Sequence, residues 1–550
     1  MSKLLPNNYE NTLCPSYCFD DVLLRPRESD VKSRNDINLD INLGTKHRSL
    51  KLKIPLISSP MDTVTGSQMA ITMALNGGIG IIHRYMSIYE LVNEVKKVKR
   101  HINYIFHDPY KLDISTTYKG ILNHINKSGV YTICITSHNP PFPKFEGIIT
   151  NRDLRKLEDI PIKKIINKTI QELNEKYHII TPLNKLVSMK YTNKTYKQMI
   201  KDKSSPDFEE CMTYARYLMN ENNIEKIPIF EKKSNGKDLH HILGMITRRS
   251  IVHYFNNRSK AALDNNGSLV VGAAIGIRNE YLENAKKLVE VGVDLLCIDV
   301  ANGHNDNTIN AVKGIRKLFP NIIIMVGNVC TGDGFHKLSN TDCDCIRVGI
   351  GNGSICSTRL ETGVGFGQFS SINECYDIKI KENLETHIIC DGGSLGKTGN
   401  KVKALASGSS AIIMGKTLGS CEESPGRIIT SNGKRMKYYR GMASTMANIS
   451  KNEKQNSESY YLSDNSNDKH TNRKRKTITQ TAEGVDGLVE LKGSVEDVLY
   501  QICGGIRSGL SYQGCYSIEE LHNLRKLYKI QWGIVTAIGM SETGIRVKTI

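Results

Sequence analysis

A regular alternation of short apolar segments and longer helix-like segments dominates the chain after about residue 267, and this alternation constrains the fold most strongly. Repeated alternation of this kind predicts a parallel sheet whose strands are buried on both faces. The apolar segments are rich in Val, Ile and Leu, and they cover residues 268–273, 295–299, 322–327, 345–349, 387–390 and 411–414. The helix-like segments cover 280–291, 307–319, 368–376 and 399–406. Near the N-terminus, the apolar runs 54–57 and 79–82 alternate with the helix-like stretches 67–75 and 88–98.

Polar or glycine-rich residues follow directly after these strands, at 299–302, 327–328, 349–356, 391–393 and 415–416. In a (β/α)8 barrel the carboxyl ends of all strands meet at one rim, where active sites are built. An open doubly wound sheet is the alternative, but no G-x-G-x-x-G fingerprint follows the first strand. The sequence therefore predicts an α/β fold with a (β/α)8 TIM barrel.

Length and composition suggest a globular protein of two or three units, with 550 residues of which 39% are apolar and 24% charged. No apolar run reaches the roughly 18 residues needed to cross a bilayer. The polar N-terminus lacks a signal-peptide h-region, and the fourteen cysteines are scattered without C-x-x-C pairs. We therefore expect reduced thiols, a cytoplasmic location and no membrane association.

The formal net charge of +18 raises the question of a nucleic-acid partner. Lysines are spread along the whole chain, however, and the one dense basic cluster, 473–476, lies in a Ser/Asn/Asp/Lys-rich stretch. Charge alone does not define a binding site. We expect this cluster to be a solvated loop, although a nuclear-import signal stays open, and we do not expect nucleic-acid binding as a main function.

The Lys/Asn/Tyr-rich middle of the chain contains two similar segments, 147–154 and 244–251, which begin 97 residues apart. Each follows an apolar strand, at 131–135 and 227–230. This repeat resembles a pair of CBS domains. The resemblance implies that purine nucleotides bind there, with Asp153 holding a ribose. Ser250 occupies the equivalent position in the second copy, so a degenerate spacer module is the alternative.

The most specific local pattern is the loop 349–359, in which Gly349, Gly351 and Gly353 alternate with other residues. Glycines leave backbone N–H and C=O groups uncovered, so the loop can approach a phosphate or a monovalent cation closely. Cys356 ends the loop and Thr358 adds a hydroxyl two residues later. This placement suits a nucleophile, although a buried cysteine in a tight turn is the structural alternative.

The loop 349–359 resembles the catalytic loop of the IMP dehydrogenase/GMP reductase family, and further family blocks occur in the expected order. These blocks are 18–26, 57–65, 77–83, 299, 327–328, 391–393, 423–426, 439–444 and 492–493. The resemblance covers essentially the whole chain, including the paired insert. It implies a barrel formed by residues 1–101 and 258–550, interrupted by a CBS-like pair at 102–257, with halves at about 102–160 and 178–257. It also implies a mobile catalytic flap at about 445–490.

The resemblance assigns roles by position. Cys356 would attack C2 of the purine of a nucleoside monophosphate, with Thr358 beside it and with Tyr460 and Glu483 contributed by the flap. Asp391 would bind the ribose, Ser59 and Met61 would line the nucleotide pocket, and Met442 and Ala443 would contact the base. The 5′-phosphate would be held by Gly393, Gly415, Ser354 and Tyr439. The substrate contacts implied are thus Ser59, Met61, Ser354, Asp391, Gly392, Gly393, Gly415, Tyr439, Gly441, Met442, Ala443 and Glu483.

A nicotinamide cofactor and a potassium ion are also implied. NAD would contact Asp299, Asn328, Arg347 and Gly349, with Asp299 on a ribose. Potassium would be bound by the carbonyls of Gly351, Gly353 and Cys356, together with Glu542, Thr543 and Gly544 of a neighbouring subunit. Such sharing of a cation predicts a homotetramer, and an octamer stays open.

Two reactions share this scaffold, and the sequence carries signals for each. NAD-dependent oxidation of IMP to XMP is favoured by the blocks 58–65 and 77–83, the paired insert, the long segment after Ser444, and Glu483 near its end. Thr445 also stands where short reductases carry a catalytic Glu. NADPH-dependent reduction of GMP is favoured by the blocks 299–303 and 361–368, and by Ser459, which precedes Tyr460 where a dehydrogenase flap carries Arg. We predict IMP oxidation, with GMP reduction second and a nucleotide-sensing or filament-forming role third.

Overall fold

The computed structural model describes residues 14–45, 47–101, 104–107, 109–128, 132–137, 144–182, 185–201, 205–232, 238–257, 259–278, 280–393, 396–447 and 481–535. The chain divides into two compact units. The first unit comprises Met1–His101, Lys260–Asp264 and Leu269–Ile550, and the second comprises Ile102–Ser259 and Asn265–Ser268. The first unit carries the barrel and the second is the insert.

Eight parallel strands form a closed barrel in the first unit, and this closure confirms the predicted TIM barrel. Almost every strand position is buried, as expected for a parallel sheet covered by helices. In order around the barrel the strands are β14 (Gly272–Ile275), β15 (Leu295–Asp299), β16 (Ile323–Val329), β17 (Cys345–Val348), β18 (His387–Asp391), β19 (Ala411–Met414), β4 (Leu56–Ser58) and β5 (Ile79–Ile82).

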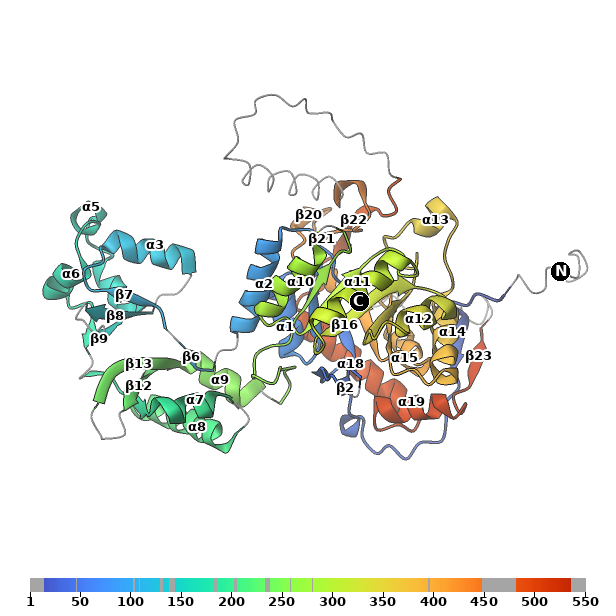
Figure 1. Cartoon of the computed structure of the whole chain (residues 1–550), viewed down its shortest axis with the longest axis horizontal. Helices are drawn as coiled ribbons and strands as arrows, with labels where there is room; N and C mark the ends of the chain where they lie inside the picture. The colour runs from blue at the N-terminus through green and yellow to red at the C-terminus, as the bar shows by residue number, and fades with distance from the viewer. Residues whose placement is uncertain are drawn as a thin grey trace, which may run out of the picture. The chain divides into compact units, whose positions relative to one another are not determined.

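Helices between these strands cover the outside of the barrel (Figure 1). They are α1 (Ser67–Leu75), α2 (Ile88–His101), α10 (Tyr281–Glu290), α11 (Asp306–Leu318), α12 (Gly332–Ser339), α14 (Gln368–Lys381), α15 (Thr398–Ala406) and α16 (Lys416–Gly419), followed by α18 (Val495–Ser511) and α19 (Ile518–Lys526). No helix in the described part of the chain is long and apolar enough to span a bilayer.

Besides the short antiparallel pair of β2 (Ile41–Asn42) and β3 (Lys51–Leu52), two small antiparallel sheets extend the barrel unit. Strand β1 (Val22–Leu24) pairs with β23 (Trp532–Ile534), which brings the two ends of the described chain together. Strands β20 (Ile428–Ser431), β21 (Lys434–Arg440) and β22 (Asp486–Glu490) form the second sheet. Part of the range expected to form a flap, 486–490, is therefore a strand in this sheet, whereas residues 448–480 lie outside the described residues.

The second unit consists of two four-stranded sheets with the same topology. In each sheet a parallel strand pair is followed by two antiparallel neighbours. The first sheet contains β7 (Lys111–Asp113), β8 (Ile133–Ser137), β9 (Lys144–Ile149) and β10 (Thr181–Pro182), and the second contains β11 (Met189–Tyr191), β12 (Lys226–Lys232), β13 (Asp238–Thr247) and β6 (Phe106–His107). Their helices are α3 (Tyr118–Ser128) and α6 (Ile170–Tyr177), and α7 (Asn193–Lys201), α8 (Pro206–Glu221) and α9 (Arg248–Asn257).

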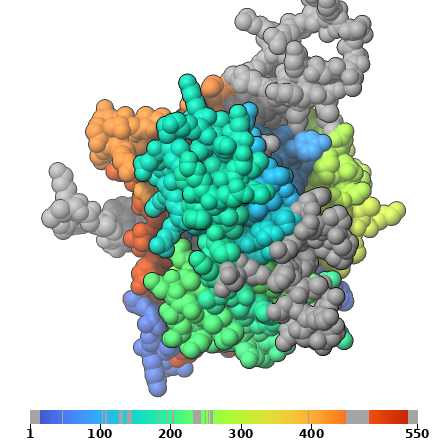
Figure 2. Space-filling view, turned by 90° about the vertical axis from the view of Figure 1, so that its left-hand side faces the viewer, coloured from blue at the N-terminus to red at the C-terminus, as the bar shows by residue number. Residues whose placement is uncertain are grey.

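The two sheets pack against each other through a shared apolar cluster that includes Phe145 and Phe230, whose ring centroids are 5.0 Å apart. Figure 2 shows the two halves as adjoining teal and green surfaces. The division differs from the expected halves. Strand β6, at residues 106–107, pairs with β13 of the second sheet, whereas α6 and β10, at 170–182, belong to the first. A two-residue strand is fixed by its distant partner, which local sequence does not encode.

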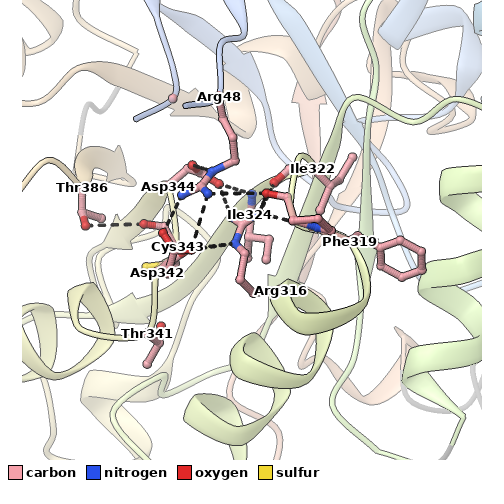
Figure 3. A network of polar contacts seen from close by, with 12 residues as sticks. Arg48, Arg316, Phe319, Ile322, Ile324, Thr341, Asp342, Cys343, Asp344 and Thr386 are labelled. Atoms are coloured by element: carbon pink, nitrogen blue, oxygen red, sulfur yellow. Dashed lines mark hydrogen bonds and ion pairs between the residues drawn. The ribbon is translucent and has the colours of Figure 1, made fainter. Parts of the chain in front are cut away.

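A buried carboxylate, Asp344, ties the N-terminal segment to the barrel (Figure 3). Its Oδ1 accepts from Arg48 Nε at 2.6 Å, and its Oδ2 accepts from Arg316 Nη2 at 2.7 Å and from the backbone N–H of Ile324 at 2.8 Å. The Asp344 side chain is fully buried, and the side chains of Arg48 and Arg316 are 7% and 10% exposed. Asp342 also pairs with both arginines, but its side chain is 58% exposed.

This network generates a stability prediction. Asp344→Ala leaves two buried guanidinium groups without their main counter-charge, so we expect a loss of about 3–5 kcal/mol in the free energy of unfolding of the barrel unit. Asp342→Ala is the matched control, and we expect it to cost about 1 kcal/mol or less because its charge is solvated. Urea unfolding followed by circular dichroism measures both. Equal losses in the two variants would contradict the assignment of Asp344 as the anchor.

Candidate functional site

A cavity of about 320 Å³ opens at the carboxyl ends of the barrel strands. Its walls come from segments that follow β4, β5, β15, β16, β17, β18 and β21, which are far apart in sequence. Most of the predicted site residues line it: Ser59, Met61, Asp299, Asn328, Arg347, Gly349, Gly351, Gly353, Cys356, Thr358, Asp391, Tyr439, Gly441, Met442, Ala443 and Glu483. Ser354, Gly392, Gly393 and Gly415 are not among the lining residues. Tyr460, Glu542, Thr543 and Gly544 lie outside the described residues.

Cys356 lies at the start of a hydrogen-bonded chain of side chains. Its Sγ is 3.1 Å from Thr358 Oγ1, and Thr358 Oγ1 donates to Glu483 Oε2 at 2.8 Å. Because the Thr358 proton points to the carboxylate, a lone pair of the Thr358 oxygen is free to face the sulfur. The arrangement places a thiol, a hydroxyl and a carboxylate in sequence, a geometry that can activate a cysteine for nucleophilic attack.

A short backbone ladder holds Glu483 in this position. The N–H of Ser357 donates to Glu483 O at 3.0 Å, and the N–H of Val485 donates to Ile355 O at 3.0 Å. On the other side, the N–H of Glu483 donates to Ala443 O at 3.2 Å. The segment 483–485 is thus held between the cysteine loop and residues 441–444, and this close approach fixes the carboxylate against Thr358.

Gly484 lies at the centre of that ladder. A Cβ at this position would be 3.2 Å from Ser444 N and 3.4 Å from Gly441 Cα, so a larger residue would push the three segments apart. Cys356 and Ser444 both form isolated β-bridges with Gly484. The glycine therefore allows the two backbones to lie close to the nucleophile.

Arg347, on β17, joins two carboxylates across the cavity wall. Its Nη1 is 2.7 Å from Asp299 Oδ1 and its Nη2 is 2.8 Å from Asp391 Oδ2, and its side chain is 8% exposed. Asn328 Nδ2 also donates to Asp391 Oδ2 at 2.8 Å and to Gly349 O at 2.7 Å. Desolvation alone would raise the pKa of Asp299, but Arg347 and Arg84 outweigh it and hold that pKa below its ordinary value. Asp299 is therefore a carboxylate throughout the neutral range.

Sequence reasoning missed Arg84 and Tyr85, both of which line the cavity. Arg84 Nε is 3.2 Å from Asp299 Oδ2, and the Tyr85 hydroxyl donates to Met442 O at 2.8 Å. Burial raises the pKa of Tyr85, so the hydroxyl remains a donor. The available signal was their position directly after β5, because residues that follow barrel strands face the site.

On another side of the cavity, Gly415 approaches Tyr439, Met61 and Ser59. A Cβ at Gly415 would lie 2.9 Å from Tyr439 Oη and 3.4 Å from Met61 Sδ. Tyr439 is 3% exposed, and burial raises its pKa to about 12 although a hydrogen bond with Ser354 opposes the shift. The predicted phosphate contacts Gly415, Tyr439 and Ser354 are therefore adjacent.

The neighbouring loop after β18 contains Gly392 and Gly393, with φ of +84° and +70°. These left-handed values favour glycine. The N–H of Gly393 donates to Asn352 O at 3.2 Å, so this amide must leave that carbonyl before it can bind a phosphate. The loop after β18 and the cysteine loop are thus in direct contact.

The cysteine loop presents backbone carbonyl oxygens rather than acidic side chains. Gly351 has φ of +73°, and Gly353 O accepts from the N–H of Cys356 at 3.1 Å while keeping a second lone pair. Carbonyl oxygens suit a hard monovalent ion. Within the described ranges, no group of three or more His, Cys, Asp or Glu side chains forms a metal cluster. All fourteen cysteines are free thiols.

The chain is similar to known proteins over nearly its whole length. The family model described as IMP dehydrogenase / GMP reductase domain matches residues 16–545. The chain is 36% identical over 512 residues to an inosine-5′-monophosphate dehydrogenase of Nitrosopumilus maritimus, covering 93% of this chain and 95% of that protein. It is also 36% identical to an inosine-5′-monophosphate dehydrogenase of Staphylococcus saprophyticus, covering 92% and 91%.

Among solved structures, the chain is similar to a cysteine-to-alanine variant of GMP reductase from Trypanosoma brucei in complex with guanosine 5′-monophosphate. The TM-score is 0.79 at 29% identity, covering 98% of this chain and 100% of that one. The same reductase in complex with guanosine 5′-triphosphate gives a TM-score of 0.70 at 26% identity, covering 96% and 100%. The family match spans nearly the whole chain, so this protein belongs to the IMP dehydrogenase/GMP reductase family.

Proposed function

We propose that the protein is an IMP dehydrogenase, which oxidises IMP to XMP with NAD through a covalent adduct on Cys356. The observation that carries the proposal is the hydrogen-bonded chain Cys356–Thr358–Glu483 in the cavity wall. It is supported by curated relatives of that activity at 36% identity over more than nine-tenths of the chain. NAD supplies the hydride acceptor when bound.

The side chains of this cavity suit both halves of that reaction. In the first half, Cys356 Sγ bonds to C2 of the purine, its thiol proton passes to Thr358 Oγ1, and the Thr358 proton passes to Glu483. The hydrogen of C2 would then leave with its electron pair to bound NAD, and Glu483 would release its proton to solvent. In the second half, water adds at C2, Thr358 takes a water proton as its own proton passes to the ionised Glu483, and the C–S bond breaks to release XMP and the Cys356 thiolate. A positioned acid–base relay of this kind contributes about 10²–10⁴-fold to a rate.

Substrate and cofactor would be held by the charge network. Asp391 would bind the ribose of IMP, Ser59 and Met61 would flank the nucleotide, and Gly393, Gly415, Ser354 and Tyr439 would take the 5′-phosphate. Asp299, Asn328, Arg347 and Gly349 would hold NAD. Both oxygens of Asp299 already accept from arginines, so cofactor hydroxyls would share them through the remaining lone pairs.

A potassium ion would be held by the carbonyls of Gly351, Gly353 and Cys356. The residues expected to complete the site, Glu542, Thr543 and Gly544, would come from a neighbouring subunit in a homotetramer, or in an octamer built from two. The support is the glycine loop, in which these carbonyls lie within a few residues of the nucleophile.

GMP reductase is the second candidate, and one observation favours it. The segment 299–303 resembles reductases, and its residues Asp299, Val300 and Ala301 line the cavity directly. The solved structures described above are also GMP reductases. In that reaction Cys356 would bond to C2 of GMP, ammonia would leave from C2, and a hydride from NADPH would then add to C2 as the C–S bond breaks.

A paired assay separates the two candidates. We predict that the purified protein with IMP, NAD⁺ and K⁺ forms NADH, and that Cys356→Ala abolishes the reaction because no adduct can form. The measurement is absorbance of the nicotinamide in parallel reactions, IMP plus NAD⁺ against GMP plus NADPH. GMP-dependent oxidation of NADPH, without NADH production from IMP, would contradict the proposal.

The role of Thr358 gives a second prediction. Thr358→Val keeps the shape but removes the hydroxyl between Cys356 and Glu483, so we expect kcat to fall by about 100-fold or more. Ser357→Ala is the control, because among the described residues the Ser357 hydroxyl hydrogen-bonds only to Ala482 O, at 3.5 Å. We expect that control to stay within a few-fold of the wild type. A folded Thr358→Val variant with the wild-type rate would exclude the relay.

We further propose that the paired unit is a CBS pair that binds purine nucleotides near Asp153. This carboxylate is 7% exposed and accepts from Thr150 N at 3.0 Å and from Lys156 Nζ at 3.1 Å. In the second half, the hydroxyls of Ser250 and Thr247 are 2.8 Å apart, and the Ser250 N–H donates to Thr247 Oγ1 at 3.2 Å. We therefore expect calorimetry to detect ATP or GTP binding that Asp153→Ala weakens. No binding of either nucleotide would contradict the proposal.

A further inference from the structure

Lys401 on α15 is a fully buried lysine that has no ion-pair partner among the described residues. Its side chain is 0% exposed and runs back along the helix, where Nζ lies 3.5 Å from the carbonyl of Lys397. In the described part of the chain, no carboxylate forms an ion pair with it. Burying an ammonium group costs free energy unless an anion compensates its charge, so Lys401 could gain from an anion that binds nearby.

The surroundings of Lys401 place it behind the loop after β18. It interacts electrostatically with Cys390, which lies on β18 directly before Asp391. Cys390 Sγ is 3.5 Å from Gly392 O, and Gln368 Nε2 is 3.5 Å from the same sulfur. Gly393 also packs closely against Gln368, because a Cβ at Gly393 would lie only 2.7 Å from Gln368 Cγ. Lys401 therefore belongs to the layer that supports the Gly392–Gly393 loop.

A second lysine adds to the positive charge. Lys492 interacts electrostatically with Lys401, and its backbone N–H donates at 2.9 Å to the carbonyl of Ser420, which ends the turn that follows Gly415. Lys401 Nζ thus lies at the N-terminal end of α15, where the loop of Gly393 leads into the helix, and the backbone of Lys492 contacts the end of the turn that follows Gly415. Two neighbouring cations repel each other, and an anion close to both would offset the cost of that repulsion.

Lys403, on the same helix, serves as a comparison. Lys403, two residues later on the same helix, is also buried, at 8% exposure. Its Nζ donates to Phe19 O at 2.7 Å and to Asn400 Oδ1 at 3.2 Å. Lys403 is therefore satisfied within the fold, whereas Lys401 has one long hydrogen bond to a carbonyl.

We propose that Lys401, with Lys492, supplies the positive charge by which the phosphate site distinguishes a nucleoside monophosphate from a nucleoside. This inference rests on the proposed function, because it needs a 5′-phosphate at the loops of Gly393 and Gly415. Lys401 acts through its field from behind these loops, so it is a specificity-determining residue and not a catalytic one.

The proposal has a consequence for pH. Burial, reinforced by Lys492 and opposed by Cys390, lowers the pKa of Lys401 to about 8. A bound phosphate dianion would favour the charged ammonium and raise that pKa. Binding of the monophosphate should therefore take up a proton near pH 8, and affinity should fall as pH rises above that value. The phosphate itself, with a second pKa of about 6, does not titrate in this range.

Other groups facing Lys401 do not mimic this effect. Burial raises the pKa of Cys390 to about 12, so it stays a thiol near pH 8. Lys397, on the same helix, pairs with Asp20 at 3.2 Å. Lys492 is the remaining charged neighbour, and its effect is tested separately by Lys492→Met.

The test is calorimetry of IMP and of inosine binding to the full chain at pH 8, in two buffers with different ionisation enthalpies. We expect wild-type protein to take up protons with IMP and not with inosine. Lys401→Met should lose that uptake and bind IMP about tenfold more weakly, with inosine unchanged. Lys401→Arg should keep the IMP affinity and lose the uptake, because arginine does not titrate there. Lys403→Met, the matched control, should keep both.

Two results would overturn the inference. One is equal weakening of IMP and inosine by Lys401→Met, which would mark Lys401 as a packing residue. The other is proton uptake with IMP that persists in both Lys401→Met and Lys401→Arg. Wild-type protein that binds no IMP would instead reject the proposed function, and this inference with it.

Discussion

The hydrogen-bonded closure of eight parallel strands is the constraint on which the site depends. Because every strand runs in the same direction, every strand ends at the same rim, and residues at the ends of most of the strands line a common cavity. Ser59 after β4, Arg84 after β5 and Cys356 after β17 are brought together in this way. The strands themselves are buried and apolar, so the chemistry is carried by the loops.

Strand β17 connects a charge network that stabilises the barrel with a charge network in the cavity wall. Asp344, directly before its first residue, binds Arg48 and Arg316 and fixes the N-terminal segment. Arg347, near the other end of the strand, binds Asp299 and Asp391 in the cavity wall. Removing either centre leaves buried charges of one sign with less compensation, which is strongly destabilising. One strand therefore links the integrity of the barrel to the position of the proposed ribose-binding carboxylates.

The sequence predicted the barrel well because apolar strands and the polar residues after them are local patterns. Strands 295–299, 411–414 and 79–82 occur at the predicted residues. Helix α12 was not predicted, since Gly332 and Gly334 lower helix propensity, and it begins at a Thr331 cap that accepts from Gly334 N at 3.3 Å. Strand β14 begins at Gly272 and not at 268, because Leu269 instead forms a bridge with Leu263.

Side-chain pairs between distant segments could not be predicted from one sequence. Arg48 and Asp344 are 296 residues apart, and Arg84 and Asp299 are 215 residues apart. Periodicity says nothing about such pairs, because it reports only which face of an element is buried. Glu483 was identified through family resemblance, and the structure adds its contact with Thr358. The roles of Tyr460 and of residues 542–544 stay predictions.

The central claim is that Cys356 forms a covalent bond to C2 of the purine. The most direct measurement is acid quenching of the protein during turnover of IMP and NAD⁺, followed by protease digestion and mass spectrometry. The account predicts a peptide containing Cys356 that carries the mass of a xanthylyl nucleotide adduct, and no adduct in Cys356→Ala. Turnover without any adduct on Cys356, or an adduct on another cysteine, would contradict it.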